Sequence, residues 1–329
     1  MPSRFLSPFL SPFLIALAAM LWGGDLLLRP AALSAGWSPA RIVLGEHLAL
    51  SLLFAPILWR ERHQLTQLSV RGWGALLFIG WGGSALATWL YTEAFSLDPS
   101  HALTVVLLQK TQPLVAVLLA GWLLGERRSW LFWSWGAAAM AGAYLLIGFQ
   151  RPPSLMDIHA QQALLALGAA ALWGAATVAG RSLTAALSPG LLAGSRFALA
   201  VPVLALLTLV PVGVSHYAPP PLSPYLYQHL SPTQYAGLFL LLIVLLPDLA
   251  GMRLYYLGLR GTPASVATLA ELCYPLTSLL LGLFVQHTPV STGQWLGLAL
   301  LLTAVAGLGR KPGVAAPSGT SREISAATS

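Results

Sequence analysis

Long apolar runs separated by short polar breaks account for most of the chain. The breaks carry turn residues, as in "SAGWSP" at 34–39 and "SLDPS" at 96–100. The ten runs cover approximately residues 10–33, 39–59, 72–96, 100–124, 129–149, 162–185, 189–212, 233–258, 263–285 and 291–309. Because about 20 apolar residues span a bilayer as a helix, the pattern predicts an all-α integral membrane protein with ten transmembrane helices.

Composition excludes a soluble globular domain. Of the 329 residues 57% are hydrophobic and 8% charged, whereas soluble domains average about 25% charged residues. The single cysteine, Cys273, excludes an intramolecular disulfide and a cysteine-based metal site. The seven histidines show no metal-ligand spacing, so we expect neither a metal nor a cofactor.

The basic residues predict the topology. With the N-terminus in the cytoplasm, eleven of the Lys and Arg side chains fall on the cytoplasmic side. Three fall outside, at Arg29, Arg41 and Arg151, and Lys110, Arg196 and Arg253 fall within helices. This positive-inside bias predicts a multi-pass protein of the inner or plasma membrane with both termini cytoplasmic. It also accounts for most of the net charge of +7 without a nucleic-acid partner.

Three segments of the chain need an interpretation of their own. The first apolar run resembles a signal peptide, but no clear small-residue cleavage site follows, so we expect it to be retained as a helix. The connection at 213–232 is rich in proline and free of Lys, Arg, Asp and Glu; its role cannot be predicted. The small, polar tail at 310–329 is predicted to be disordered in the cytoplasm.

The two halves of the chain repeat each other. The stretch "LWGGDLLLRPAALSAGWSP" at 21–39 parallels "LWGAATVAGRSLTAALSPG" at 172–190. Likewise "LLQKTQP" at 107–113 parallels "LAELCYP" at 269–275, so that Gln109 aligns with Glu271. Each half holds five predicted helices, and an odd number gives the second copy the opposite orientation. The expected domains are five-helix repeats at 10–149 and 162–309, the inverted design of many secondary transporters.

These motifs resemble the EamA domain of the drug/metabolite transporter superfamily over roughly residues 12–309. The matching pieces are "LWGG" and "LWGA", the "SP" that opens the second helix of each half, and the fourth-helix stretches beginning "DPSHALTVV" and "TPASVATLA". The resemblance implies a ten-helix fold, cytoplasmic termini and export of small metabolites by alternating access. It does not imply one substrate.

The chain departs from the family pattern at charged positions. Arg196 keeps an arginine that the family usually has seven residues after the second-helix proline, whereas the first half has Glu46 there. Glu126 keeps the glutamate that ends the fourth helix, and His287 stands at the matching place in the second half. Lys110 and Glu271 replace residues that are usually apolar or small.

Charged residues inside the predicted helices are the candidate substrate-binding or coupling residues, because one charge near the bilayer centre costs about 2.5–3.5 kcal/mol or more. Counting from the loop apices at about 1.5 Å per residue places Asp25, Glu46 and Lys110 at one depth, so we expect the two acids to be the partners of Lys110. Glu93 lies nearer the outer surface. The full set of candidates is Lys110, Asp25, Glu46, Glu271, Gln109, Arg253, Asp248, Arg196, Glu93, Trp22, Trp173 and Tyr91.

Two interpretations of these charges stay open. They are either ion pairs that lock helices together, such as Arg253 with Glu271, or groups in a water-filled cavity that bind a polar substrate or protons. In the second interpretation Lys110 holds an anionic group and Asp25 or Glu46 takes up a proton. For Arg196 the family match favours a scaffold role.

The expected function is a secondary transporter that exports small polar metabolites such as amino acids, with proton coupling as a further expectation. The aromatic residues Trp22, Trp89, Tyr91, Trp173, Tyr255, Tyr256 and Tyr274 are candidates to line its cavity. One alternative is an antiporter of anionic metabolites of the sugar-phosphate or nucleotide-sugar type. Another is an intramembrane enzyme, which the absence of metalloprotease and serine-hydrolase motifs disfavours. The expected partners are a small-molecule substrate and the lipid bilayer, and the chain is either a monomer or a homodimer.

Overall fold

The computed structural model describes residues 10–97, 102–148, 160–209, 224–284 and 290–310. Every regular element in these ranges is helical. His287, most of the proline-rich connection, and all of the predicted tail at 310–329 except its first residue lie outside the described residues.

The described residues of the first half form the following helices, in chain order. They are α1 (Leu10–Trp22), α2 (Asp25–Ser34), α3 (Pro39–Glu61), η1 (Arg62–Gln67), α4 (Val70–Phe78), η2 (Ile79–Leu86), α5 (Ala87–Leu97), α6 (Ala102–Gln109), α7 (Gln112–Leu123) and α8 (Trp130–Gly148). The second half holds α9 (Ala160–Leu183), α10 (Pro189–Leu207), α11 (Pro224–His229), α12 (Pro232–Ile243), η4 (Val244–Ala250), α13 (Gly251–Gly261), α14 (Ala264–Ala270), η5 (Glu271–Cys273), α15 (Tyr274–Phe284) and α16 (Thr292–Arg310).

Eight helical stretches of the described residues are long and apolar enough to cross a membrane. They are Leu10–Ser34, Pro39–Gln67, Val70–Leu97, Thr104–Leu123, Trp130–Ile147, Ala160–Leu183, Pro189–Leu207 and Pro232–Gly261. The ninth predicted span is divided into α14, η5 and α15, and the tenth contains the shorter apolar helix Thr292–Leu308. The chain is therefore a multi-pass membrane protein, and the count of ten stays a prediction.

Serine–proline pairs fix the starts of three spanning helices. At α3, α10 and α12 the serine hydroxyl accepts a hydrogen bond from a backbone N–H in the first turn, and proline follows at the first helical position. Proline suits this position because its missing N–H would have no partner inside the helix. Two of these pairs, Ser38–Pro39 and Ser188–Pro189, are the "SP" motifs of the predicted repeat.

Irregular segments interrupt the spanning helices at corresponding places in the two halves. The third span of each half contains a widened, π-helical stretch, η2 in the first and η4 in the second. The fourth span of each half is broken, between α6 and α7 in the first half and at η5 in the second. In membrane transporters such breaks expose backbone and polar side chains to a central site. Asp248, Lys110 and Glu271 all lie in these segments.

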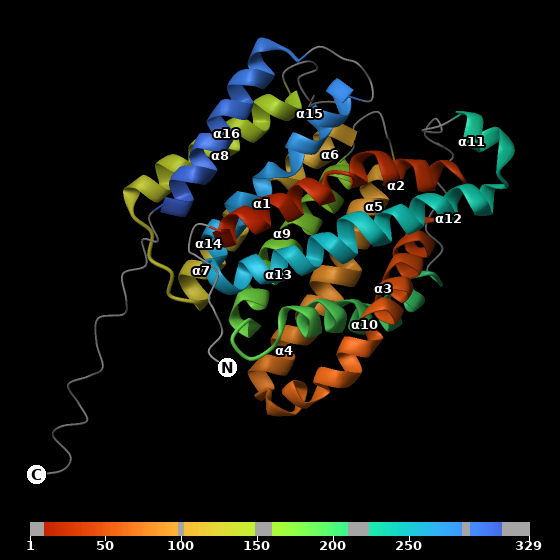
Figure 1. The fold of residues 1–329 in the computed structure, drawn as a ribbon, viewed down its shortest axis with the longest axis horizontal. Coiled ribbons are helices and arrows are strands. Elements are labelled where there is room, and N and C mark those ends of the chain that lie inside the picture. The colour runs from red at the N-terminus through yellow and green to blue at the C-terminus, as the bar shows by residue number, and fades with distance from the viewer. Residues whose placement is uncertain (1–9, 98–101, 149–159, 210–223, 285–289, 311–329) are drawn as a thin grey trace, which may run out of the picture.

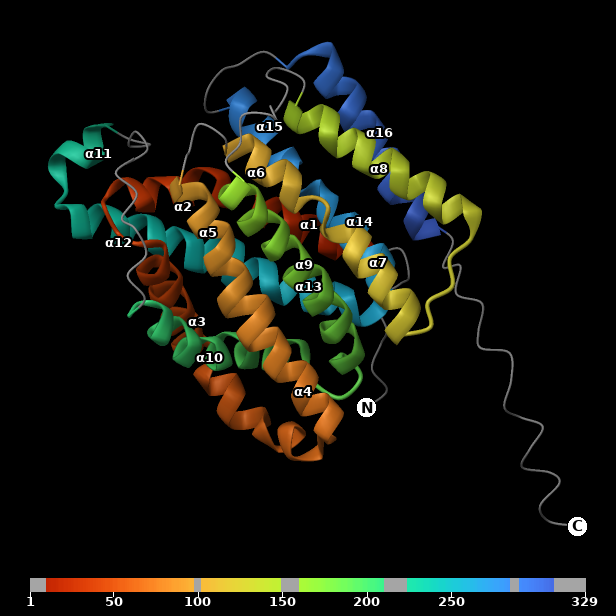
Figure 2. The same ribbon diagram turned by 180° about the vertical axis from the view of Figure 1, so that it is seen from behind.

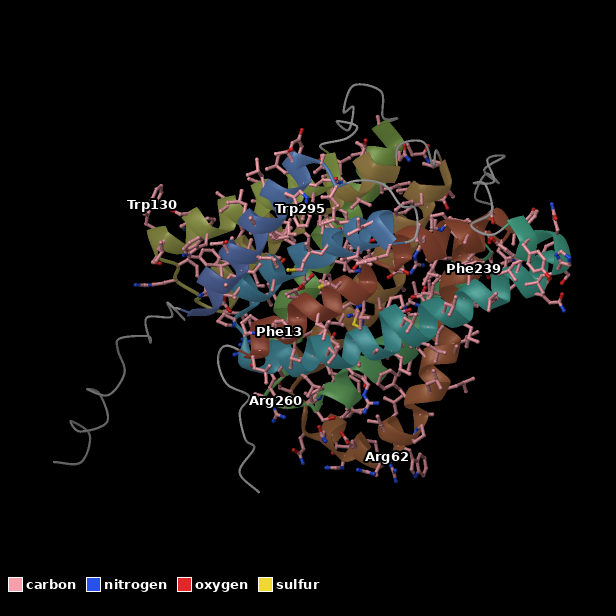
Figure 3. All side chains as sticks on the ribbon, turned by 45° about the horizontal axis from the view of Figure 1, so that its top comes forward. Phe13, Arg62, Trp130, Phe239, Arg260 and Trp295 are labelled. Carbon is pink, nitrogen blue, oxygen red and sulfur yellow. The ribbon has the colours of Figure 1, made fainter. Side chains whose placement is uncertain are left out.

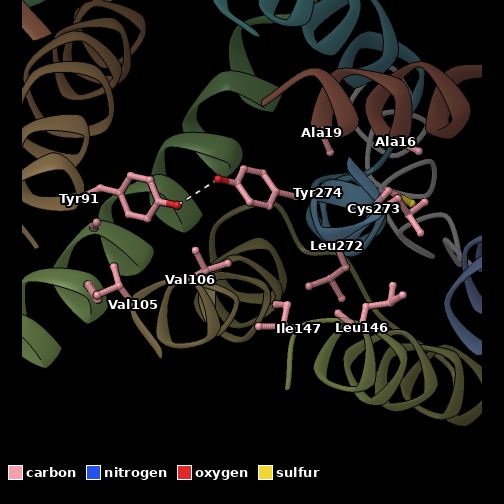
Figure 4. Close-up of a cluster of buried hydrophobic side chains, with 14 of the residues drawn as sticks. Ala16, Ala19, Tyr91, Val105, Val106, Leu146, Ile147, Leu272, Cys273 and Tyr274 are labelled. Carbon is pink, nitrogen blue, oxygen red and sulfur yellow. Dashed lines mark hydrogen bonds between the residues drawn. The ribbon is translucent and has the colours of Figure 1, made fainter. Parts of the chain in front are cut away.

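The helices pack as a bundle whose two halves interlock. Extensive contacts join α3 to α10 and α1 to α13, whereas α8 and α16 lie side by side along one edge (Figures 1 and 2). Large apolar side chains such as Phe13, Trp130 and Trp295 are more than half exposed on the outside of the bundle (Figure 3), as expected where lipid is the solvent. Interior side chains such as Val105, Val106 and Leu272 form a buried core (Figure 4).

Candidate functional site

A cavity of about 110 Å³ lies between the two halves of the bundle. Three cationic and four acidic side chains line it, together with a wall of aromatic rings. Its lining comprises Trp22, Asp25, Arg29, Glu46, His47, Ser84, Thr88, Tyr91, Gln109, Lys110, Gln112, Trp173, Ala176, Thr177, Arg196, Phe197, Asp248, Met252, Tyr255, Tyr256, Glu271 and Tyr274.

Arg29 organises one side of the cavity. Its guanidinium donates to Asp25 Oδ2 at 2.9 Å and to Glu46 Oε2 at 3.0 Å. A third hydrogen bond reaches Thr92 Oγ1 at 3.2 Å. Only 2% of the Arg29 and Glu46 side chains is exposed, and two carboxylates around one guanidinium compensate its burial.

Asp248 extends this acidic group from the second half. It lies on the π-helical segment η4, within hydrogen-bonding reach of Glu46. Asp248 Oδ2 and Asp25 Oδ1 are buried without a hydrogen-bond partner. We refer to Asp25, Glu46 and Asp248 as the acid cluster.

Lys110 lies at the break between α6 and α7. Its ammonium is 3.8 Å from the centre of the Tyr274 ring, a cation–π contact. The carboxylate with which it interacts electrostatically is Glu271, at the corresponding break of the second half. Opposite charges from the two interrupted helices therefore face one cavity.

A chain of hydrogen bonds holds Glu271. Gln109 Nε2 donates to Gln112 Oε1 at 2.7 Å, and Gln112 Nε2 donates to Glu271 Oε2 at 2.7 Å. On its other oxygen Glu271 accepts from Thr177 Oγ1 at 3.4 Å, and Tyr255 donates to Thr177 at 3.0 Å. The chain links four spanning segments around a single carboxylate.

Arg196 is the third cation of the cavity, on α10. Its nitrogens contact Ser84 Oγ, the Gly83 carbonyl and the Tyr256 hydroxyl, each at 3.3 Å, and Met252 Sδ at 3.2 Å. All four partners are neutral.

Aromatic side chains close the remaining wall. Tyr91 and Tyr274 are joined by a hydrogen bond of 3.1 Å between their hydroxyl groups, from α5 across to α15 (Figure 4). Trp173 packs on Tyr91 with ring centres 5.1 Å apart, and Trp22 packs on Tyr255 at 5.2 Å. These rings offer faces and edges for stacking against a flat ligand.

The structure gathers ten of the twelve predicted site residues in this cavity. They are Asp25, Glu46, Gln109, Lys110, Arg196, Asp248, Glu271, Trp22, Tyr91 and Trp173. Among the further aromatic candidates, Tyr255, Tyr256 and Tyr274 line it and Trp89 does not.

Two predicted residues lie elsewhere. Arg253 is exposed on α13, because Met252, Tyr255 and Tyr256 occupy the cavity face of that helix. The predicted pairing of Arg253 with Glu271 is therefore wrong. Glu93 is buried, with 3% exposed, but does not line the cavity.

The predicted partners of Lys110 also require correction. Arg29, which the sequence analysis placed outside the membrane, is buried and binds both Asp25 and Glu46. The reason is that a new helix, α2, begins at Asp25 and carries Arg29 one turn further on the same face. The spacing of Asp25 and Arg29, four residues apart in an apolar run, was the available signal. Gln112, Thr177 and Ser84 gave no comparable signal.

Comparisons with known proteins agree with this architecture. The EamA-like transporter family matches residues 10–148 and 161–310. A riboflavin transporter, ImpX, of Fusobacterium nucleatum is 27% identical over 89% of this chain and 95% of its own length. An uncharacterized transporter, YwfM, of Bacillus subtilis is 26% identical over 88% of this chain and 90% of its own. A solved crystal structure shares the fold with a TM-score of 0.67 at 19% identity, covering 92% of this chain and 96% of the other.

Proposed function

This chain belongs to the EamA-like transporter family, and we propose that its central cavity binds a small polar metabolite and carries it across the membrane by alternating access. The observation that carries the proposal is the cavity itself. It draws on both halves and is lined by seven charged side chains inside a membrane protein. Such side chains are expensive in a bilayer and mark substrate or ion pathways.

The breaks at Lys110 and Glu271 support a moving site. Each lies where a spanning helix is divided into two shorter helices, and half-helices can tilt separately. A change in the electrostatic interaction between Lys110 and Glu271 on substrate binding would couple the site to these helices.

An amino acid or a related zwitterion suits the cavity best. The acid cluster presents two unpartnered carboxyl oxygens, Asp25 Oδ1 and Asp248 Oδ2, that can accept hydrogen bonds from an ammonium group. The aromatic wall and the amides of Gln109 and Gln112 provide stacking and hydrogen-bonding groups for the rest of the molecule. Export, the expected direction, is part of the proposal.

A riboflavin-like ring compound is the second candidate. ImpX is named a riboflavin transporter, and the rings of Tyr91, Trp173 and Tyr274 form a wall on which a flat heterocycle could stack. The sequence similarity to ImpX, 27% identity, supports this candidate but is not the observation on which it rests.

The acid cluster also supports proton coupling. Asp248 and Glu46 are within reach of a shared proton, and a proton taken up or released there changes the charge available to the substrate and to Arg29. The transported molecule and a proton would then compete for, or share, the same carboxylates.

Reconstitution tests the proposal. We expect purified protein in liposomes to move labelled amino acids, or riboflavin followed by its fluorescence, in uptake and efflux assays. Lys110→Ala should abolish this transport with unchanged membrane expression, because the cation that faces Glu271 across the cavity is lost. Arg253→Ala is the matched control: it removes an exposed cation of a spanning helix outside the cavity, and transport should persist. Normal efflux by Lys110→Ala would contradict the assigned site.

A further inference from the structure

Arg196 is a buried cation without an acidic partner. Its side chain is 6% exposed and lines the cavity. Among the described residues no carboxylate forms an ion pair with it. Its guanidinium makes four contacts, all to neutral groups and all at 3.2–3.3 Å.

The other two cavity cations differ from Arg196 in this respect. Arg29 is held by two carboxylates at 2.9 and 3.0 Å. Lys110 has Glu271 as its acidic neighbour and the Tyr274 ring beneath its ammonium. Asp248 lies near Glu46 and Arg29. Among the described residues, Arg196 is therefore the one cavity cation that has no carboxylate as a neighbour.

Neighbouring groups hold Arg196 in place without neutralising it. His47 Nδ1 lies 2.8 Å from the Val43 carbonyl and donates to it, so that Nε2 accepts from the Ser84 hydroxyl at 3.0 Å. The Ser84 oxygen is then oriented to accept from Arg196 Nε. A buried guanidinium that is oriented in advance, with one of its five N–H donors to spare, matches a carboxylate ligand.

We propose that Arg196 binds an anionic group of the transported molecule, a carboxylate, and that the substrate of this cavity therefore carries a negative charge. The inference rests on the proposed function, whose substrate class it narrows. It assigns the carboxylate of an amino-acid-like substrate to Arg196 and leaves the amine to the acid cluster. A neutral ring compound would leave the charge of Arg196 uncompensated.

The first test needs no knowledge of the substrate. A charge kept for a ligand destabilises the empty protein, because burying it is compensated only when the ligand is present. Arg196→Met should therefore raise the melting temperature of the ligand-free full-length protein by about 2–4 °C. Arg29→Met is the matched control and should lower it, since that change strands two buried carboxylates. A drop for both variants would make Arg196 a scaffold residue and overturn the proposal.

The second test measures the charge preference directly. L-tryptophan and L-leucine are each compared with their primary amides, which keep the amine and side chain and remove only the negative charge. We expect the wild-type protein to bind at least one of these acids about tenfold or more tightly than its amide, and Arg196→Met to bind both forms equally. Equal affinity of acid and amide in the wild-type protein, or a preference that survives in Arg196→Met, contradicts the proposal.

The two tests separate this inference from the proposed function. If neither amino acid nor riboflavin binds or is transported, the proposed substrates fail, while the sign of the melting shift still decides whether Arg196 holds an uncompensated charge. If riboflavin binds equally to wild type and Arg196→Met, transport stands and the anionic substrate class is rejected.

Discussion

Three cations face one cavity, and their surroundings differ. Arg29 binds two carboxylates, Lys110 faces Glu271 and an aromatic ring, and Arg196 contacts neutral groups. A cation held in an ion pair has its charge compensated within the protein, whereas a buried cation without an acidic partner is available to a ligand. This difference is the reason for our proposal that Arg196, the cation without an acidic partner, binds the substrate.

At the same scale, Asp248 is predicted to carry the coupling proton. Asn in its place keeps the shape and donates a permanent hydrogen bond to Glu46, as a protonated Asp248 would. We expect Asp248→Asn to retain substrate exchange between the two sides of a liposome and to lose accumulation driven by a pH gradient. Glu93→Gln, a buried acid outside the cavity, should keep both activities. Gradient-driven accumulation at the wild-type level in Asp248→Asn would exclude this role.

Which charged residues gather in one cavity could largely be predicted from the sequence, but their side-chain partners could not. Counting along helices placed Asp25, Glu46 and Lys110 near one level, and all three line the cavity. The topology assignment put Arg29 outside, because it treats a span as one regular helix and cannot detect the new helix that begins at Asp25. The side of the helix that turns inward decides between Tyr255 and Arg253, and a count of depth along the helix does not determine its rotation.

At the scale of elements, breaks in the helices position the chemistry. Gly23 and Gly24 separate α1 from α2, and a Cβ on Gly23 would lie 2.5 Å from Thr277 Cβ and 2.6 Å from the Tyr274 carbonyl oxygen. Only glycine lets the two segments approach so closely. The fourth spans were predicted as continuous runs, so their breaks near Pro113 and Pro275 were missed, and so were the π-helical stretches η2 and η4.

This close approach predicts the effect of a single methyl group. Gly23→Ala should destabilise the protein by about 1–3 kcal/mol, as overpacking does, and should disturb Tyr274 and its contact with Lys110. Gly74→Ala is the control, because a Cβ there meets nothing within 4 Å; it should be neutral or stabilise by up to about 1 kcal/mol. Thermal unfolding of both variants in the same detergent tests this prediction. An unchanged stability for Gly23→Ala would contradict it and show that the segment with Tyr274 and Thr277 moves to make room for the methyl group.

At the scale of the whole molecule, a polar contact joins the two halves away from the cavity. Glu126, between α7 and α8, accepts hydrogen bonds from the backbone N–H groups of Ala264 and Ser265 at 2.8 and 3.1 Å and from the Ser265 hydroxyl. Arg128 pairs with the same carboxylate. All residues of α14 are buried, and Val266 and Leu269 belong to the main apolar core. The carboxylate adds polar contacts at the start of this helix.

The charge of Glu126 makes that contact depend on pH. Burial raises the pKa of the carboxyl group, but hydrogen bonds from Ser265 and Arg128 outweigh it and hold the pKa below 4.5. A lowered pKa adds stability that is complete above the unfolded value and is lost as the pH falls through the folded one. We therefore expect acidification below about pH 4.5 to lower the melting temperature of the wild-type protein more steeply than that of Glu126→Gln, which should already be less stable at neutral pH. Because α14 leads directly into Glu271, Glu126→Gln should also weaken substrate binding. If the melting temperatures of the two proteins fall in parallel on acidification, Glu126 does not cause the pH dependence.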